Sequence, residues 1–311
     1  MQDLEFRSAT ALLLDAVPDN RNATRTMLYS IGFREIEAVG EAPTAERCIQ
    51  TRFTDLLVAE VTGSVGPVCQ LVNRIRQGEL GVNPFMVVMI TAWDAASPVV
   101  RAVVQSGADD LVTRPFSTSQ LKKRILAQIE ARKRFVVTSD YIGPDRRKDG
   151  GREDNGSELI AVPNSLKART VDGKTPEDVL GEIGLMRRAV GIERMRKLAN
   201  RIAVTAMLLT DRLGGGDATY VDPGEVVVLR RVCAELMERV DGSPYESIAE
   251  LCTTALTLCE SLIEEDGGTS KNLSLLSHLA SAMQVTLNPH RDEGEMAREI
   301  ASTVQRVRQR A

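Results

Sequence analysis

Short apolar runs alternate with segments of helical periodicity over the first 133 residues, and this alternation constrains the fold more than any other feature. The runs are rich in Leu, Val and Ile, which is typical of strands buried on both faces. Regular alternation of this kind predicts a parallel sheet covered by helices on both sides. The predicted strands cover 11–14, 35–39, 55–59, 85–91 and 110–113. The predicted helices cover 20–31, 44–51, 68–77, 98–106 and 118–133.

The composition changes after residue 133. Glycine, proline and charged residues dominate 134–175, which predicts a flexible polar linker. From 176 to 311 every signal is helical, and Pro176 marks a helix start. The predicted helices there cover 176–189, 191–213, 223–240, 244–265, 270–287 and 292–310. The fold class is therefore α/β plus all-α, with domains at 1–133 and 176–311.

Composition also excludes some classes of function. A formal net charge of -4 gives no electrostatic case for nucleic acid or an anionic membrane as the main partner. The apolar run near the amino terminus ends at Asp15 and is too short for a signal peptide or a membrane span. Five cysteines without a CxxC motif indicate reduced thiols. We therefore expect a cytoplasmic protein without disulfides.

Polar residues stand where four of the predicted strands end. Asp15, Glu60 and Thr91 end the first, third and fourth strands, and Arg114 follows the fifth. In an open α/β sheet, ligands bind beyond the carboxyl ends of the strands. The sequence therefore predicts that these four side chains meet in one shallow pocket.

Residues 9–131 resemble the response-regulator receiver family in the order LLLDAVPDNRNATRTMLYSIGF, DLLVAEVTG, VVMITAWD and SGADDLVTRPFS. The resemblance implies a flavodoxin-like five-stranded sheet, a bacterial two-component pathway and a phosphoryl-accepting site. In that family two adjacent acids after strand one help hold Mg²⁺, and an aspartate after strand three accepts the phosphoryl group. A Ser/Thr after strand four and a lysine before a proline bind the phosphoryl oxygens. The carboxyl-terminal half resembles no family in this way.

This chain departs from the family pattern at three of those positions. Ala16 replaces the second acid, so Mg²⁺ binding is weakened and only Asp15 and Glu60 remain as candidate ligands. Glu60 is one methylene longer than the family's aspartate, which disturbs the geometry of in-line attack. Arg114 replaces the lysine and suits a bidentate pair with a carboxylate. We therefore hypothesise a pseudo-receiver, independent of phosphorylation and without a cofactor, held by a Glu60–Arg114 contact. The alternative is a drifted pocket that is kept only as scaffold.

Two further positions concern switching and partners. Receivers of this family often carry an aromatic residue three positions before the lysine, and Leu111 stands there instead. Trp93, the single tryptophan, follows Thr91 and is a candidate interface residue, although a partly covered loop position is the simpler interpretation. By the resemblance, the face formed by 98–133 is a candidate homodimer surface.

The helical half carries no recognised catalytic motif, so we expect a non-enzymatic domain that binds a signalling protein. Two alternatives remain open. One is an active phosphorelay component that accepts phosphate at Glu60 or at His278, one of only two histidines in the chain. The other is a nucleic-acid-binding regulator that uses Arg146, Arg147 and Arg152 of the linker. The role of the segment 141–147 is not predicted.

Overall fold

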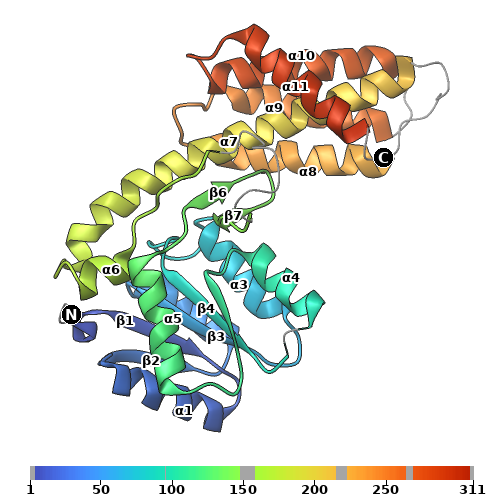
Figure 1. Ribbon diagram of the computed structural model, residues 1–311. Helices are drawn as coiled ribbons and strands as arrows, with labels where there is room; N and C mark the ends of the chain where they lie inside the picture. Colours follow the sequence, from blue (N-terminus) through green and yellow to red (C-terminus); the bar gives the residue numbers. More distant parts are fainter. Residues whose placement is uncertain (1–3, 95, 148–157, 215–222, 264–268, 309–311) are drawn as a thin grey trace. The chain divides into compact units, whose positions relative to one another are not determined.

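The computed structural model describes residues 4–94, 96–147, 158–214, 223–263 and 269–308. The chain divides into two compact units, Met1–Ala189 and Val190–Ala311. Figure 1 shows an α/β arrangement at the amino-terminal end and helices at the carboxyl-terminal end. The predicted fold class is confirmed.

The first unit contains a five-stranded parallel sheet in the order β2-β1-β3-β4-β5. A single 3₁₀ turn, Phe6–Ser8, precedes the sheet. The strands are β1 Thr10–Leu14, β2 Glu35–Val39, β3 Leu56–Val61, β4 Val87–Ala92 and β5 Asp110–Thr113. The helices are α1 Pro18–Ile31, α2 Ala42–Thr51, α3 Gly66–Arg76, α4 Ser97–Ser106 and α5 Thr118–Glu130. All ten elements that the alternation predicted are present.

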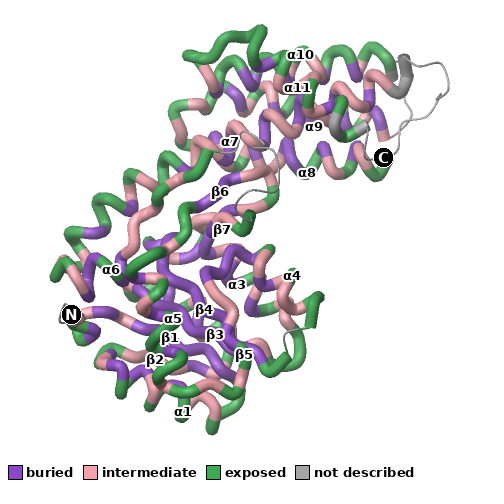
Figure 2. Tube along the Cα trace, in the orientation of Figure 1, coloured by how far each residue is buried: buried purple, intermediate pink, exposed green. Residues whose placement is uncertain are grey.

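Side chains of each strand point alternately to two apolar cores, one on each face of the sheet. Leu12 and Leu14 of β1 pack with residues of α2, α3 and α4 on one face. Ala11 and Leu13 pack with residues of α1 and α5 on the other. Figure 2 shows the central strands β1, β3 and β4 as an almost continuously buried layer, as the Val- and Leu-rich runs predict. The edge strands β2 and β5 are only partly buried.

The segment after α5 is ordered where the structure describes it, so the prediction of a flexible linker over 134–175 is wrong there. It forms an antiparallel hairpin of β6 Phe135–Val137 and β7 Ile142–Pro144, followed by a short helix α6 Ser165–Thr170. All six hairpin strand residues are buried. Residues 148–157 lie outside the described residues. The apolar run Phe135–Val137 was too short to be recognised as a strand among the glycines and charged residues.

Helix α7 Pro176–Gly214 is continuous, so the prediction of two helices broken at residue 190 is also wrong. Gly191 lowers helix propensity but does not remove a hydrogen bond as proline would. The other helices are α8 Pro223–Val240, α9 Ile248–Ile263, α10 Thr269–Leu287 and α11 Glu293–Arg308. Their apolar faces, with the second part of α7, enclose one core that includes Cys233, Cys252 and Cys259.

Candidate functional site

The predicted pocket forms at the carboxyl edge of the parallel sheet. Glu60 of β3 lies beside Thr91 of β4 in the strand register, and Asp15 directly follows β1. All three side chains are buried. Arg114 follows β5 and is only 7% exposed in its side chain. The sequence prediction that these four polar groups meet at one edge therefore agrees with the geometry.

Arg114 binds both carboxylates of the pocket. Its Nε donates to Glu60 Oε2 at 2.6 Å, and one terminal nitrogen donates to Asp15 Oδ2 at 3.1 Å. The same nitrogen donates to the Thr24 hydroxyl at 3.0 Å. The Thr91 hydroxyl donates to Glu60 Oε2 as well. We call Asp15, Thr24, Glu60, Thr91 and Arg114 the Arg114 cluster.

The Glu60–Arg114 contact was expected, but its form was not. The predicted bidentate pair on Glu60 is wrong, because the guanidinium divides its donors between Glu60 and Asp15. Thr24 was missed: it lies on the buried side of α1, and a polar residue on a predicted core face was the only signal. Ala16 is exposed and offers no side-chain donor or acceptor.

The cluster holds two carboxylates and one guanidinium away from water. Burial raises the pKa of Asp15, against the opposing effects of the Val17 N–H, Arg114 and Arg21. The Val17 N–H donates to Asp15 Oδ1 at 2.9 Å. Glu60 Oε1 is buried and has no hydrogen-bond partner among the described residues. Two carboxylates therefore share the one guanidinium of the cluster, Arg21 adds a second positive charge next to Asp15, and one acceptor oxygen of Glu60 is unused.

These residues do not fit the Mg²⁺ ion that the family resemblance implies. Mg²⁺ requires several oxygen ligands in octahedral geometry. Here Arg114 already neutralises one oxygen of Asp15 and one of Glu60, and Ala16 supplies no ligand. Among the described residues, no group of three or more His, Cys, Asp or Glu side chains is placed to hold a metal ion.

The positions predicted for switching and for partners are Leu111, in β5, and Trp93, just past β4. Leu111 is half-buried and packs against the core beneath α2, α3 and α4. Trp93 lies just past β4 and is 60% exposed. An exposed tryptophan at this position is available to a partner.

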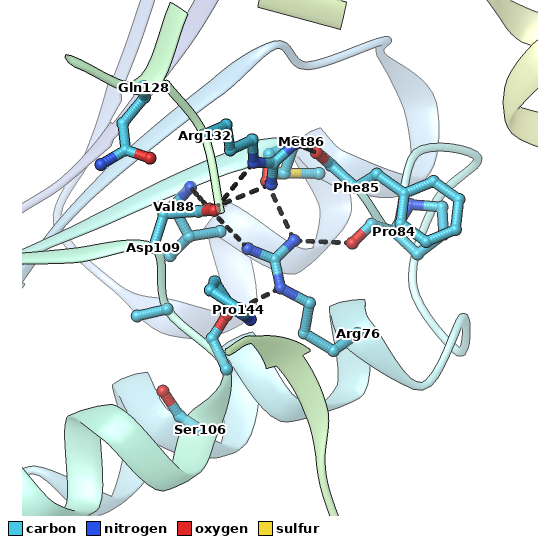
Figure 3. Close-up of polar contacts among 12 residues, drawn as sticks. Arg76, Pro84, Phe85, Met86, Val88, Ser106, Asp109, Gln128, Arg132 and Pro144 are labelled. Atoms are coloured by element: carbon cyan, nitrogen blue, oxygen red, sulfur yellow. Dashed lines mark hydrogen bonds and ion pairs between the residues drawn. The ribbon is translucent and has the colours of Figure 1, made fainter. Parts of the chain in front are cut away.

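A second polar cluster, which the sequence did not predict, lies at the opposite end of β5. Figure 3 shows Arg76 and Arg132 both directed at Asp109. Arg76 donates to Asp109 Oδ2 at 2.8 Å, and Arg132 donates to Oδ1 at 2.8 Å. The Val88 N–H donates to Oδ2 at 2.8 Å. We call Arg76, Asp109, Arg132 and Phe135 the Asp109 cluster.

Backbone carbonyls and an aromatic ring accommodate the extra positive charge of the Asp109 cluster. Arg76 donates to the carbonyls of Gly107, Pro84 and Met86. Both guanidiniums lie over the Phe135 ring, at 5.2 Å for Arg76 and 5.0 Å for Arg132. Burial lowers the pKa of Arg76 to about 10, opposed by the nearby Asp109 carboxylate. Burial works against ionisation of Asp109 too, but the two arginines hold its pKa below the ordinary value.

The segment 141–147 anchors the hairpin next to this cluster. Arg146 donates to the carbonyl oxygens of Ala108 and Asp109. Gly143 lies against Gly107 so closely that a Cβ on Gly143 would come within 2.7 Å of Gly107 Cα. Arg147 donates to Asp145. The two arginines of the predicted basic linker are thus engaged within the domain, while Arg152 lies outside the described residues.

The helical unit presents one of the two histidines on a helix surface. His278 is exposed on α10, and His290 is exposed in the turn before α11. No helix of the described part is long and apolar enough to cross a bilayer.

Sequence comparison relates the chain to two-component proteins. It is 30% identical over 258 residues to the sensor histidine kinase GacS of Pseudomonas protegens, covering 80% of this chain and 26% of that protein. It is 32% identical over 130 residues to the phosphate regulon transcriptional regulatory protein PhoB of Rhizobium meliloti, covering 40% of this chain and 55% of that protein. The chain thus spans about a quarter and about half of these relatives. No family model matches it.

Solved structures resemble the first part of the chain. A CheY-like response regulator receiver domain protein from Methanospirillum hungatei is 18% identical, with a TM-score of 0.35, over 39% of this chain and 92% of that one. The receiver domain of sensor histidine kinase PA1611 from Pseudomonas aeruginosa is 23% identical, with a TM-score of 0.34, over 39% of this chain and 96% of that one. The amino-terminal unit contains a receiver domain homologous to those of response regulators and sensor kinases.

Proposed function

We propose that this protein is an atypical response regulator whose receiver works without phosphorylation and acts in the cytoplasm by binding another signalling protein. The observation that carries the proposal is the state of Glu60. The residue in the acceptor position is buried, longer than aspartate, and bound by Arg114 and Thr91. The side chains that would bind an incoming phosphoryl group are therefore already bound to a carboxylate of the protein itself.

The chemistry of phosphoryl transfer supports this proposal. Catalysis in such transfers consists mainly of positioning and of neutralising charge on the phosphoryl oxygens. In the Arg114 cluster the guanidinium faces Asp15 and Glu60, and it is the only cation that donates to either side chain among the described residues. An incoming phosphoryl group would compete with Asp15 and Glu60 for the guanidinium that binds them both. Accepting phosphate would therefore require Arg114 to release a carboxylate.

An intact-mass assay tests the proposal. The purified full chain is incubated with Mg²⁺ and acetyl phosphate, beside the variants Glu60→Asp and Glu60→Asp/Ala16→Asp/Arg114→Lys. The triple variant restores the family's acid pair, acceptor and lysine, so its phosphorylation establishes that the assay works. We expect no adduct on the wild type and an adduct on the triple variant. A stoichiometric adduct on the wild type that is absent from Glu60→Gln would refute the proposal.

A second candidate function is phosphoryl transfer through His278. Two observations favour it: the exposure of this histidine on α10 and the extent of the match to a sensor histidine kinase. That match covers more residues than the first unit contains, so it reaches into the helical unit. Incubation with a phosphorylated receiver, with His278→Ala beside the matched control His290→Ala, separates this candidate from the first. Phosphate on the wild type and on His290→Ala, but not on His278→Ala, would support it.

Nucleic-acid binding through the basic segment receives less support. Arg146 donates to two backbone carbonyls and Arg147 to Asp145, so these guanidiniums are already occupied. A DNA-binding titration that weakened steeply with salt would support this third candidate.

A further inference from the structure

The first part of α7 presents two very different faces. Val179 and Ile183 are fully buried, and they define the face that packs onto the protein. Two exposed leucines flank the opposite face, Leu180 at 36% and Leu185 at 65% exposure. Figure 2 shows exposed segments along this part of the helix. We define the outer face of α7 as Glu177, Leu180, Gly181, Gly184, Leu185 and Arg188.

Read from either end, the outer face has the order charged residue, Leu, Gly, Gly, Leu, charged residue. The charge is negative at the first end and positive at the other. Glu177, Gly181, Gly184 and Arg188 are spaced by four, three and four residues, so they form one stripe along the helix. Leu180 and Leu185 flank that stripe on its two sides. The midpoint of the pattern lies between residues 182 and 183.

This order is complementary to a second copy of itself in the antiparallel direction. Around the midpoint, Glu177 faces Arg188 of the second copy, and Arg188 faces its Glu177. Gly181 then meets Gly184 of the other helix, and the two-fold axis places Leu180 of both copies along one margin of the contact and Leu185 of both copies along the other. A two-fold axis repeats each contact twice, which is the property of an isologous interface.

The charges at the two ends of the outer face are available for such a contact. Neither the Glu177 carboxylate nor the Arg188 guanidinium has a hydrogen-bond or ion-pair partner within the described ranges of the chain. Their neighbours are engaged: Glu182 binds Lys174 at 2.6 Å, and Asp178 accepts from Thr175. The unpaired charges are therefore the two that the antiparallel arrangement brings together.

The two glycines leave room for a second helix. A Cβ built on Gly181 would meet no heavy atom within 4 Å, and one on Gly184 would meet only the Arg188 guanidinium at 4.0 Å. Packing inside the chain therefore does not require glycine at either position, although glycine weakens a helix relative to alanine. Side chains set the distance between packed helices, so two facing glycines allow close approach.

We infer that the outer face of α7 is a self-association surface that binds the same face of a second copy in antiparallel orientation. The contact spans about three helical turns, which places it at the small end of protein interfaces and makes the dimer weak and reversible. Complementary charge selects orientation and partner in such contacts. This inference is independent of phosphorylation and of the candidate dimer surface at 98–133.

Sedimentation equilibrium on the full chain tests the inference by charge reversal. Glu177→Arg alone and Arg188→Glu alone each place like charges opposite one another twice in the dimer. We expect each to weaken dimerisation by about tenfold at low salt. The double variant Glu177→Arg/Arg188→Glu restores opposite charges and should dimerise as the wild type does. An equimolar mixture of the two single variants should form a heterodimer.

Lys122→Glu, an exposed charge on α5, serves as the matched control for the 98–133 surface. A wild type that stays monomeric at about 200 µM would overturn the inference, since even a weak interface should be populated there. A dimer that survives both single reversals but is lost in Lys122→Glu would overturn it too, and would assign dimerisation to the receiver face.

Discussion

Replacing Phe135 by alanine tests whether the hairpin is part of the receiver fold. Phe135 is fully buried, and its ring lies under both arginines of the Asp109 cluster. Truncating a buried phenylalanine costs about 3–5 kcal/mol, and the two lost cation–π contacts add about 1 kcal/mol or more. The total is a large part of the roughly 5–15 kcal/mol that stabilises a domain. We therefore expect the receiver to unfold at much lower denaturant concentration.

Urea denaturation followed by Trp93 fluorescence measures this loss in the receiver alone, because Trp93 is the only tryptophan of the chain. With an m-value of about 2 kcal/mol/M, a loss of about 4–6 kcal/mol moves the midpoint down by about 2–3 M. Leu159→Ala, at a 38% exposed position of the same segment, is the control and should shift it little. A Phe135→Ala midpoint within about 0.5 M of the wild type would refute the view that the hairpin belongs to the domain.

Three further predictions concern single side chains. Arg114→Met removes the guanidinium that donates to both buried carboxylates and should cost about 3–5 kcal/mol, whereas Arg114→Lys keeps the charge and should cost less, both measured by thermal unfolding. Gly143→Ala forces a methyl group against Gly107 and should cost about 1–3 kcal/mol in urea, so an unchanged midpoint would contradict the close contact. The pKa of Asp109 is lowered in the fold, so its contribution to stability is present above about pH 4 and is lost as the pH falls through the folded pKa. Asp109→Asn should therefore have a lower free energy of unfolding at neutral pH, and this free energy should change less with pH below about pH 4. Urea denaturation at a series of pH values measures both effects.

The sheet and the Arg114 cluster were predictable because both depend on local signals. Apolar runs of strand length fix the strands, and a polar residue at a strand end must lie at the sheet edge. Thr24 was not predictable, since a single threonine on a helix gives no indication of what it contacts. The division of the Arg114 donors between two carboxylates depends on distances that no spacing in the sequence encodes.

The hairpin was missed for a different reason. Phe135–Val137 is an apolar run of only three residues, and Ile142–Pro144 contains glycine and proline. Composition cannot distinguish such a segment from a linker, because its order comes from long-range contacts to Gly107 and Asp109. Those contacts require the folded sheet. The predicted break at residue 190 within α7 failed similarly, since helix propensity alone does not decide where a long helix ends.

The Arg114 cluster and the Asp109 cluster lie at the two ends of the short strand β5, so a movement of this strand would affect both. Arg114 follows β5 and Asp109 precedes it, with only the four residues Asp110–Thr113 between them. At one end, two carboxylates share a guanidinium; at the other, two guanidiniums share a carboxylate. Buried ion pairs add little net stability, but moving one partner away leaves an uncompensated charge, which is costly. A displacement of β5 would disturb both clusters at once. Substituting Glu60 by aspartate alone would leave Asp109 with both of its arginines, so we expect Glu60→Asp to remain in the same conformation, with unchanged hydrogen exchange across 110–113.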